Sequence, residues 1–303
     1  MPTILRPAND AEISTILGWT HALWGGGRTL EVYNDFTRGL LATEWGLARF
    51  RFILGVDARG EAVCACKRYE FDIWRGREAA TAIGFGAVFT RPEARGQGHA
   101  AAMIRSLMQE AKSAGVAVAL LYSDIGAPYY ESLGFQALGG FEANAPALNG
   151  AQVFRAFTAQ DGSLLPRWWE AMAVHPEFQG FRYGRDERYW QYLGRRVGTT
   201  TWIYAPENGP AKGYLAGRLR DGVLSVQEAG WDLDVAETTF WKDVRIHATA
   251  LGGTKATVRG WLPKHASQAG FALAPVTDGI PMLAALDGLK SPQDAALWGH
   301  DHF

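Results

Sequence analysis

Residues 81–115 hold the feature that most limits how this chain can fold. The run TAIGFGAVFT has the composition of a strand, and Arg91-Pro92 ends it because proline has no backbone donor for a ladder. A loop, ARGQG, follows, and HAAAMIRSLMQEAKSAG then places its apolar residues on one helical face and ends at Gly115. The next run, VAVALLYS, is short and apolar, as buried strands are. Strand, loop, helix and strand in this order predict a layered α/β fold.

The neighbouring sequence supplies further elements of the same layer. Cap residues and helical spacing predict helices at 9–23 and 31–44. The turn at 57–60 separates strands predicted at 51–56 and 62–74, as in a hairpin. The segment APYYESLGF predicts one more short helix, with a strand after it. These elements form one complete α/β layer structure with a mixed central sheet flanked by helices.

The second half shows a similar but incomplete pattern. Its predicted elements are helices at 163–174 and 186–197, strands at 200–205, 213–219 and 223–229, a helix at 236–251 and a strand at 255–261. Three strands, a helix and a strand repeat the order of the first half without its glycine loop. We expect a degenerate copy of the same fold.

The length of 303 residues fits two domains of ordinary size. We predict a first domain at 1–148 that carries the glycine loop and a second, degenerate domain at 149–286. The tail at 287–303 is polar, contains Trp298, and is expected to form a C-terminal arm.

Composition removes several classes of protein. Thirty Lys and Arg residues against 31 Asp and Glu argue against a nucleic-acid binder with a broad basic face. Two cysteines, Cys64 and Cys66, can form neither a disulfide framework nor a four-ligand zinc site. No apolar run reaches the length of a membrane span, and the first residues carry no secretory signal. We therefore expect a soluble, cytoplasmic protein.

The loop at 95–100, RGQGHA, lies where a strand ends and a helix begins. Main-chain N–H groups and the positive end of the helix dipole converge there and favour a pyrophosphate group. Glycine at 96 and 98 lets the backbone approach phosphate oxygens closely. An unrelated nucleotide-binding protein would need Lys-Ser/Thr after the loop or an acid about 20 residues further on at the end of a strand. His99-Ala100 follows the loop here, so that alternative is poor.

Two segments resemble the signatures of the GNAT N-acetyltransferase superfamily. VFTRPEARGQGHAAAMI is similar to its acetyl-coenzyme A loop, Arg/Gln-x-x-Gly-x-Gly/Ala, and LYSDIGAPYYESLGF is similar to its second signature, a strand and a short tyrosine-bearing helix. The resemblance covers about residues 1–140 and is closest to fungal lysine N-acetyltransferases and their bacterial relatives. The two-lobed layout also resembles the tandem acetyltransferases typified by the enhanced intracellular survival proteins.

The resemblance implies acetyl-CoA as co-substrate, no metal, and a set of cofactor-binding positions. The expected cofactor-binding residues are Val88, Phe89 and Thr90 along the pantetheine arm, Arg95 as the loop anchor, and Gly96, Gln97, Gly98, His99 and Ala100 around the pyrophosphate. By the same motif, Tyr130 corresponds to the tyrosine that protonates the departing thiolate. Its neighbour Tyr129 is a rival for this role.

The general base that deprotonates the amine is less defined. The strand at 79–90 has no acid after Glu78, where many relatives place a glutamate. Glu70 and Asp72 are same-face neighbours on the preceding strand, and Glu70 is one candidate base. The terminal carboxylate of Phe303 is another, because some tandem relatives return their C-terminus into the active site.

The expected reaction is direct attack of an amine on the acetyl thioester within a ternary complex. The fungal resemblance points to lysine or another small cationic amine, and Asp72 and Asp124 are candidate substrate-binding residues. Polyamines, aminoglycosides and protein amines stay open as acceptors, and a homo-oligomer is compatible with the sequence. The rival from another class is a non-catalytic acyl-CoA sensor, in which the second domain transmits occupancy to a partner.

Overall fold

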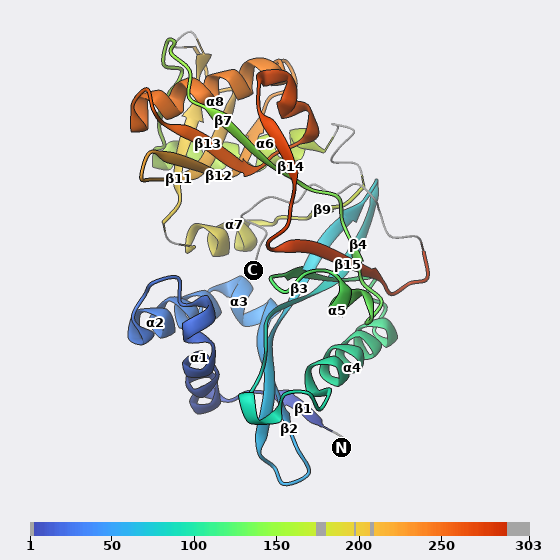
Figure 1. The fold of residues 1–303 in the computed structure, drawn as a ribbon. Helices are drawn as coiled ribbons and strands as arrows, with labels where there is room; N and C mark the ends of the chain where they lie inside the picture. Colours follow the sequence, from blue (N-terminus) through green and yellow to red (C-terminus); the bar gives the residue numbers. More distant parts are fainter. Residues whose placement is uncertain (1–2, 174–179, 197, 207–208, 290–303) are drawn as a thin grey trace.

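The computed structural model describes residues 3–173, 180–196, 198–206 and 209–289. Two mixed sheets, each flanked by helices, lie one above the other in Figure 1. The predicted α/β class with a mixed central sheet is confirmed. Phe303 and most of the predicted C-terminal arm lie outside the described residues.

The first sheet is formed mainly by the first half of the chain. Its strands are β1 (Ile4–Pro7), β2 (Phe50–Val56), β3 (Ala62–Arg75), β4 (Glu78–Thr90), β5 (Val118–Ser123), β6 (Gln136–Ala137), β9 (Arg182–Tyr183) and β15 (Ile280–Ala285). The order across the sheet is β1-β2-β3-β4-β5-β15-β6, and β9 pairs with β3 away from this path. Only the β4–β5 neighbours are parallel along the path; the other pairs are antiparallel.

The second sheet has the same plan. Its strands are β7 (Phe141–Pro146), β8 (Phe154–Ala156), β10 (Thr200–Tyr204), β11 (Gly213–Arg220), β12 (Val223–Trp231), β13 (Thr257–Trp261) and β14 (Ala272–Pro275). From one edge the order is β8-β10-β11-β12-β13-β7-β14, again with a single parallel pair at the fourth and fifth positions, β12–β13. Each sheet also has one register shift between its third and fourth strands.

The sixth strand of each sheet comes from the other half of the chain. β7 follows β6 in the sequence but pairs with β13 and β14 in the second sheet. β15 follows β14 but lies between β5 and β6 in the first sheet. The two sheets therefore exchange these strands reciprocally. The predicted division at residue 148 places β7 with the first unit and β15 with the second, which differs from the observed pairing. Periodicity indicates that a segment is a strand but not which strand it joins.

Helices cover both sheets. They are α1 (Asp10–Trp24), α2 (Leu30–Leu41), α3 (Glu44–Arg49), α4 (His99–Ser113), α5 (Pro128–Glu131), α6 (Leu165–Met172), α7 (Glu187–Gly194) and α8 (Glu237–Gly252), with 3-10 turns at Pro92–Ala94, Ala159–Leu164 and Lys264–Ala269. None of the helices within the described ranges is long and apolar enough to cross a membrane.

The helix predicted at 31–44 corresponds to α2 but ends three residues earlier than predicted, and a separate short helix, α3, begins at Glu44. α2 ends at Leu41, and Thr43 caps α3 because its Oγ1 accepts a hydrogen bond from the Gly46 amide at 2.9 Å. By contrast, α1 begins where its cap predicts. The side chain of Asn9 accepts from the Glu12 amide at 3.0 Å, and Glu12 accepts from the Asn9 amide at 2.8 Å.

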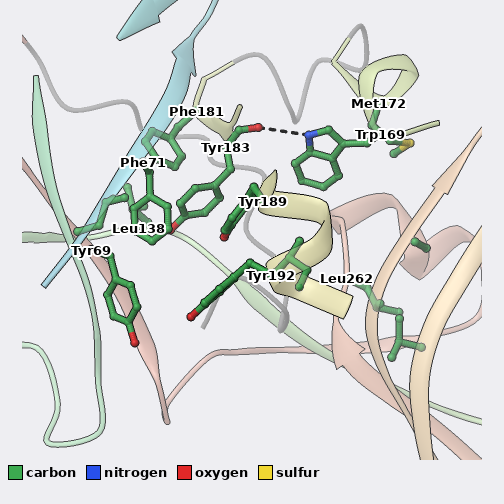
Figure 2. Close-up of a cluster of buried hydrophobic side chains, with 14 of the residues drawn as sticks. Tyr69, Phe71, Leu138, Trp169, Met172, Phe181, Tyr183, Tyr189, Tyr192 and Leu262 are labelled. Carbon is green, nitrogen blue, oxygen red and sulfur yellow. Dashed lines mark hydrogen bonds between the residues drawn. The ribbon is translucent and has the colours of Figure 1, made fainter. Parts of the chain in front are cut away.

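An aromatic cluster joins α3 of the first unit to α7 of the second. The ring centroid of Trp45 lies 4.8 Å from that of Tyr189 and 4.5 Å from that of Tyr192. Figure 2 shows the two α7 tyrosines beside Tyr69 and Phe71 of β3. Contacts of this kind contribute beyond the area they bury, so the two units share one core.

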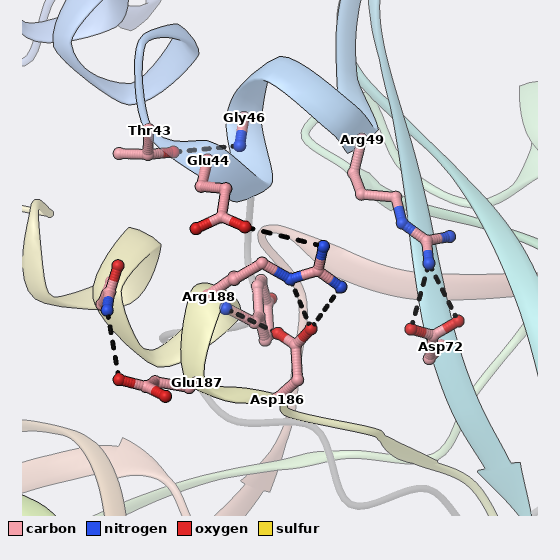
Figure 3. A network of polar contacts seen from close by, with 10 residues as sticks. Thr43, Glu44, Gly46, Arg49, Asp72, Asp186, Glu187 and Arg188 are labelled. Carbon is pink, nitrogen blue, oxygen red and sulfur yellow. Dashed lines mark hydrogen bonds and ion pairs between the residues drawn. The ribbon is translucent and has the colours of Figure 1, made fainter.

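A polar network borders this cluster (Figure 3). The Asp186 carboxylate caps α7 by accepting from the Tyr189 amide at 2.8 Å, and Arg188 pairs with the same carboxylate at 2.8 Å. Arg188 also lies 3.9 Å from Glu44 on α3. These exposed pairs fix orientation more than they add stability.

The exchanged strand makes a direct stability prediction. Leu283 on β15 is fully buried between β5 and β6, so Leu283→Ala should lower the free energy of unfolding by about 2–5 kcal/mol. Leu289→Ala removes the same atoms from a side chain that is 59% exposed and should change it by less than about 0.5 kcal/mol. Urea unfolding followed by tryptophan fluorescence and by circular dichroism measures both. Two separate transitions in the wild-type protein would contradict the shared core.

Candidate active site

The two parallel strands of the first sheet separate at one end. β4 and β5 pair from Ala82 opposite Val118 to Phe85 opposite Leu121. Beyond this point β4 continues to Thr90 while the chain leaves β5 at Ser123. An opening between the ends of parallel strands leaves backbone groups available to a ligand.

A bulge in β4 lies at this opening. Lys67 pairs with Gly86 and Ala65 with Phe89, so one residue of β3, Cys66, faces two residues of β4. Within the bulge Ala87 has a φ of 44°. A left-handed conformation costs an L-residue roughly 1–2 kcal/mol, and such strain gathers at functional sites.

The glycine loop runs from the end of β4 to α4. Gly96 and Gly98 have φ of 74° and 77°, and a Cβ at either position would meet no atom within 4 Å. Gly98 is the N-cap of α4, and no side chain caps it. The open space above both glycines and the uncapped first turn of the helix suit an anionic group.

Two of the predicted loop residues, Arg95 and His99, use their side chains for contacts within the protein. Arg95 donates from Nε to the Thr90 carbonyl at 3.3 Å and lies over the Phe89 ring at 5.8 Å, which ties the loop to β4. The His99 ring is buried, and its Nδ1 lies 2.9 Å from Thr3 Oγ1. His99 can therefore offer a ligand its backbone N–H rather than its imidazole.

The other predicted cofactor positions have varied surroundings. Phe89 is buried and stacks on Trp19 with centroids 6.3 Å apart. Val88, Thr90 and Ala100 are half-buried, and Gln97 is exposed. The side chain of Val88 packs against the core beneath α4. Backbone contacts along β4 are thus compatible with this packing.

Tyr130 belongs to the same buried cluster as Cys66, the residue of β3 that lies opposite the bulge. It is 8% exposed on the short helix α5, and its ring is 6.0 Å from that of Phe135. Burial raises the pKa of Tyr130, and the charges of Tyr129, Asp124 and Cys66 act in the same direction. The Tyr130 hydroxyl is therefore protonated at neutral pH.

The thiols near this site stay protonated as well. Burial raises the pKa of the Cys64 thiol to about 11 and raises that of Cys66 further. Since the thiolate is the reactive form, neither cysteine is suited to act as a nucleophile.

The structure does not bring Glu70 and Asp72 to this place. Glu70 pairs in register with Ile83, inside the paired part of β4, and forms an ion pair with Arg68 at 3.2 Å. Asp72 lies farther along β3 and pairs with Arg49 of α3 at 3.3 Å (Figure 3). Both carboxylates therefore serve local ion pairs away from the bulge.

Asp124 lies directly after β5, at the end where β4 and β5 no longer pair. It acts electrostatically on Tyr130 and accepts a hydrogen bond from the Trp24 indole at 3.2 Å. This bond joins the end of α1 to the end of β5 at the opening. Trp24 was not predicted from the sequence, and its place at the end of the helix, directly before three glycines, was the available signal.

Lys67 is a second residue that the sequence analysis missed. It shares a face of β3 with Ala65, Tyr69 and Phe71, and it lies directly opposite Gly86. Burial, followed by the charge of Arg196, lowers the pKa of Lys67 to about 8. Alternation along CACKRYEF already predicts an inward lysine on an otherwise apolar face, which is an unusual arrangement.

The described part of the chain contains no candidate metal site. Among the residues the structure describes, no three His, Cys, Asp or Glu side chains gather into a group that could hold a metal ion.

Comparison with known proteins agrees with this geometry. Residues 5–138 match the family described as acetyltransferase (GNAT) domain. No curated protein matches the chain significantly.

Several solved structures share the fold over most of both chains. A probable N-acyltransferase from Enterococcus faecalis is 14% identical with a TM-score of 0.72, covering 95% of this chain and 73% of that one. A GCN5-related N-acetyltransferase from Anabaena variabilis is 15% identical with a TM-score of 0.70, covering 94% and 73%. Eis1 from Mycobacterium abscessus is 16% identical with a TM-score of 0.61, covering 94% and 74%.

At identities of 14–16%, the solved structures show that the fold is shared. The family match covers the residues that form the opening, the bulge and the glycine loop. Over residues 5–138 the chain is therefore similar in sequence to the acetyltransferase (GNAT) domain family.

Proposed function

We propose that this protein transfers an acetyl group from acetyl-CoA to the amine of a small acceptor by direct attack. The observation that carries the proposal is the meeting of three features at the opening between β4 and β5. These are the bulge at Ala87, the uncapped glycine loop at 95–98 and the buried hydroxyl-bearing ring of Tyr130. Acetyl transfer from acetyl-CoA would use all three, because it needs a site for the pyrophosphate, stabilisation of charge on the thioester oxygen and a proton for the departing thiolate.

Each feature has a distinct role in this proposal. Main-chain N–H groups of the loop and of the first turn of α4 hold the pyrophosphate, and Arg95 fixes the loop through Thr90. Backbone N–H groups freed by the bulge stabilise the negative charge that develops on the thioester oxygen. Tyr130 gives its proton to the departing thiolate as the tetrahedral intermediate collapses.

The acceptor amine must lose a proton before it attacks. Glu70 is held by Arg68 away from the bulge, which weakens it as the base. The terminal carboxylate of Phe303 lies outside the described residues and stays our prediction for this role. Asp124 is the carboxylate that acts on Tyr130, and we propose that it orients the acceptor amine.

The second sheet is proposed to be a degenerate copy of the first. Its strand order and directions repeat those of the first sheet, and α8 follows β12 as α4 follows β4. It would then serve as a wall of the acceptor site, because α7 packs against α3 and β3. A lysine-like amino acid is our proposed acceptor.

An acyl-CoA sensor is the alternative function. It would bind acetyl-CoA at the same loop without using Tyr130. Release of free thiol in the presence of an amine separates the two functions.

Substitution at the loop tests the cofactor site. Gly98→Ala places a Cβ in the left-handed region and in the space proposed for the pyrophosphate, so acetyl-CoA should bind at least about tenfold more weakly. Gly60→Ala is the matched control, because Gly60 has a φ of 80°, also meets nothing within 4 Å, and lies in the distant β2–β3 turn. Calorimetry with acetyl-CoA should show an unchanged Kd for the control. Equal weakening in both variants would refute the loop assignment.

Substitution of Tyr130 tests the proton donor. Tyr130→Phe should lower kcat for thiol release by about a hundredfold, because the thiolate then leaves unprotonated. Tyr129→Phe changes the neighbouring ring in the same way and should leave kcat within about twofold. Since burial raises the pKa of Tyr130, wild-type kcat should not fall through phenol ionisation between pH 7 and about pH 10. A larger loss in the Tyr129 variant would transfer the role to that residue.

Removal of Phe303 alone tests the proposed base. The deletion shifts the terminal carboxylate by one residue, and kcat should fall by about tenfold or more while the Kd for acetyl-CoA stays constant. Phe303→Leu keeps the carboxylate in place and is expected to retain turnover. Unchanged turnover after the deletion would remove the terminal carboxylate from the mechanism.

A further inference from the structure

A cavity of about 260 Å³ lies in the second unit, between α7 and the second sheet. The residues on its walls include Trp190, Leu193, Thr201, Tyr214, Ala216 and Glu228. The volume suits a small molecule, and the walls combine aromatic, aliphatic and hydrogen-bonding groups, as ligand sites do. The proposed acetyl transfer assigns no role to this cavity.

A row of three residues on neighbouring strands forms one wall of the cavity. Thr201 of β10 pairs with Ala216 of β11, and Ala216 pairs with Glu228 of β12. Directly opposed residues share a face of a sheet, and all three line the cavity. Next to this row the register shifts by one residue, at Gln227 of β12. The cavity therefore lies at a bulge in the second sheet.

The bulges of the two sheets correspond in position. β4 pairs with its parallel neighbour β5 up to Phe85 and bulges at Ala87, shortly after this pairing ends. β12 pairs with its parallel neighbour β13 up to Val226 and bulges at Gln227, directly after the pairing ends. The strand orders of the two sheets agree as well. The cavity thus lies at the bulge that corresponds to the one at the proposed acetyl-transfer site.

The second unit lacks a loop suited to a pyrophosphate. The chain between β12 and α8 reads DLDVA and contains no glycine. Asp232 in this loop pairs with Arg167 at 2.9 Å, and Asp234 pairs with Lys212. Two carboxylates therefore lie where the first unit has its glycine loop, and like charges repel a phosphate group. The ligand of this cavity is accordingly not a second acetyl-CoA.

The buried charge in the cavity wall is already balanced. Glu228 is 1% exposed, and its carboxylate lies 2.7 Å from the guanidinium of Arg185, whose side chain is fully buried. The Tyr214 hydroxyl donates to the same carboxylate, and Arg185 stacks on the Trp169 ring at 3.5 Å. A second charged residue of the wall, Arg196, is only half-buried, so water screens its charge. A charged ligand would lose its hydration without gaining a buried counter-charge, which is unfavourable.

Uncharged groups form most of the remaining wall. The rings of Trp190 and Phe157 lie on it with the aliphatic side chains of Leu165 and Leu193. Aromatic rings pack favourably against groups of this kind. The Thr201 hydroxyl is both a donor and an acceptor, so it can bind an amide or a hydroxyl group of a ligand.

We propose that the second unit binds, in this cavity, a small uncharged aromatic molecule that carries an amide or hydroxyl group. Trp190 and Leu193 of α7 line the cavity. Tyr189 and Tyr192 of the same helix contact Trp45 of α3 in the first unit. α7 therefore lies between this site and the first unit (Figure 1). Binding uses only residues of the second unit, so the proposal does not depend on the proposed acetyl transfer.

Three probes of similar size and different charge test the ligand class. Benzamide is uncharged, whereas at neutral pH benzoate is an anion and benzylamine is a cation. Saturation-transfer NMR titrations of the whole chain give the Kd of each probe. Benzamide should bind with a Kd in the millimolar range or tighter, and at least about tenfold more tightly than either charged probe. Saturating acetyl-CoA should change the Kd of benzamide by less than about twofold.

A variant that fills the cavity tests where benzamide binds. Gly194 lines the cavity, and a Cβ there would meet nothing within 4 Å, so Gly194→Leu adds a side chain at the wall without a clash. Gly18→Leu is the matched control, because Gly18 is a glycine of α1 with the same open space. Leucine favours a helix more than glycine does, so both variants should fold. Gly194→Leu should weaken benzamide binding about tenfold or more, and Gly18→Leu by less than about twofold.

Thr201→Val is the second variant if Gly194→Leu does not fold. It removes the hydroxyl at nearly constant volume and should weaken benzamide binding by about threefold to tenfold. Thr200→Val is its control, because Thr200 is the exposed neighbour on the same strand. The Kd of benzamide should stay unchanged in this control.

Absence of saturable benzamide binding would overturn the proposal, as would equal or tighter binding of a charged probe. Equal Kd values for benzamide in the cavity variant and its control would also overturn it. Competition between benzamide and acetyl-CoA would contradict it too, because the probe would then bind at the opening between β4 and β5.

Discussion

The exchange of β7 and β15 is the constraint on which the rest of the molecule depends. Between β5 and β6 of the first sheet, the strand that satisfies their backbone groups is β15, and β7 does the same for β13 and β14. Neither sheet can be completed by its own half of the chain. The position of β5 beside the β4 bulge, and hence the opening for the co-substrate, therefore depends on residues that follow the second sheet.

This shared construction would let both units contribute to the proposed acceptor site. The first unit supplies Tyr130, in the buried cluster that contains Cys66, and Asp124, which accepts a hydrogen bond from Trp24. The second unit supplies α7, which fills the face of β3 with Tyr189 and Tyr192. Because the units cannot slide apart without breaking sheet hydrogen bonds, charges on separate elements keep fixed relative positions.

Local signals in the sequence were sufficient for the main helices, for strands β2 to β5 and for the glycine loop, but the exchanged strands β7 and β15 were not predicted. The cap at Asn9 and the glycines before α4 act within a few residues, so they can be interpreted without the fold. Strand pairing acts over long distances and could not be predicted in the same way. Alternation correctly grouped Glu70 with Asp72, but only the register with β4 shows that Glu70 lies opposite Ile83. Lys67 was visible as an inward lysine, yet the Arg196 charge that acts on its pKa comes from a distant segment.

The exchange also has a consequence for how the chain is made. During synthesis β5 and β6 leave the ribosome long before β15. The edges of β5 and β6 that pair with β15 therefore stay unpaired until the second unit has been translated. β7 likewise waits for β13 and β14. Neither half can reach its native state as a nascent fragment, and the cell must protect open strand edges through most of translation. A chain terminated before β15 would keep the unpaired edges of β5 and β6, which can pair with other chains and aggregate.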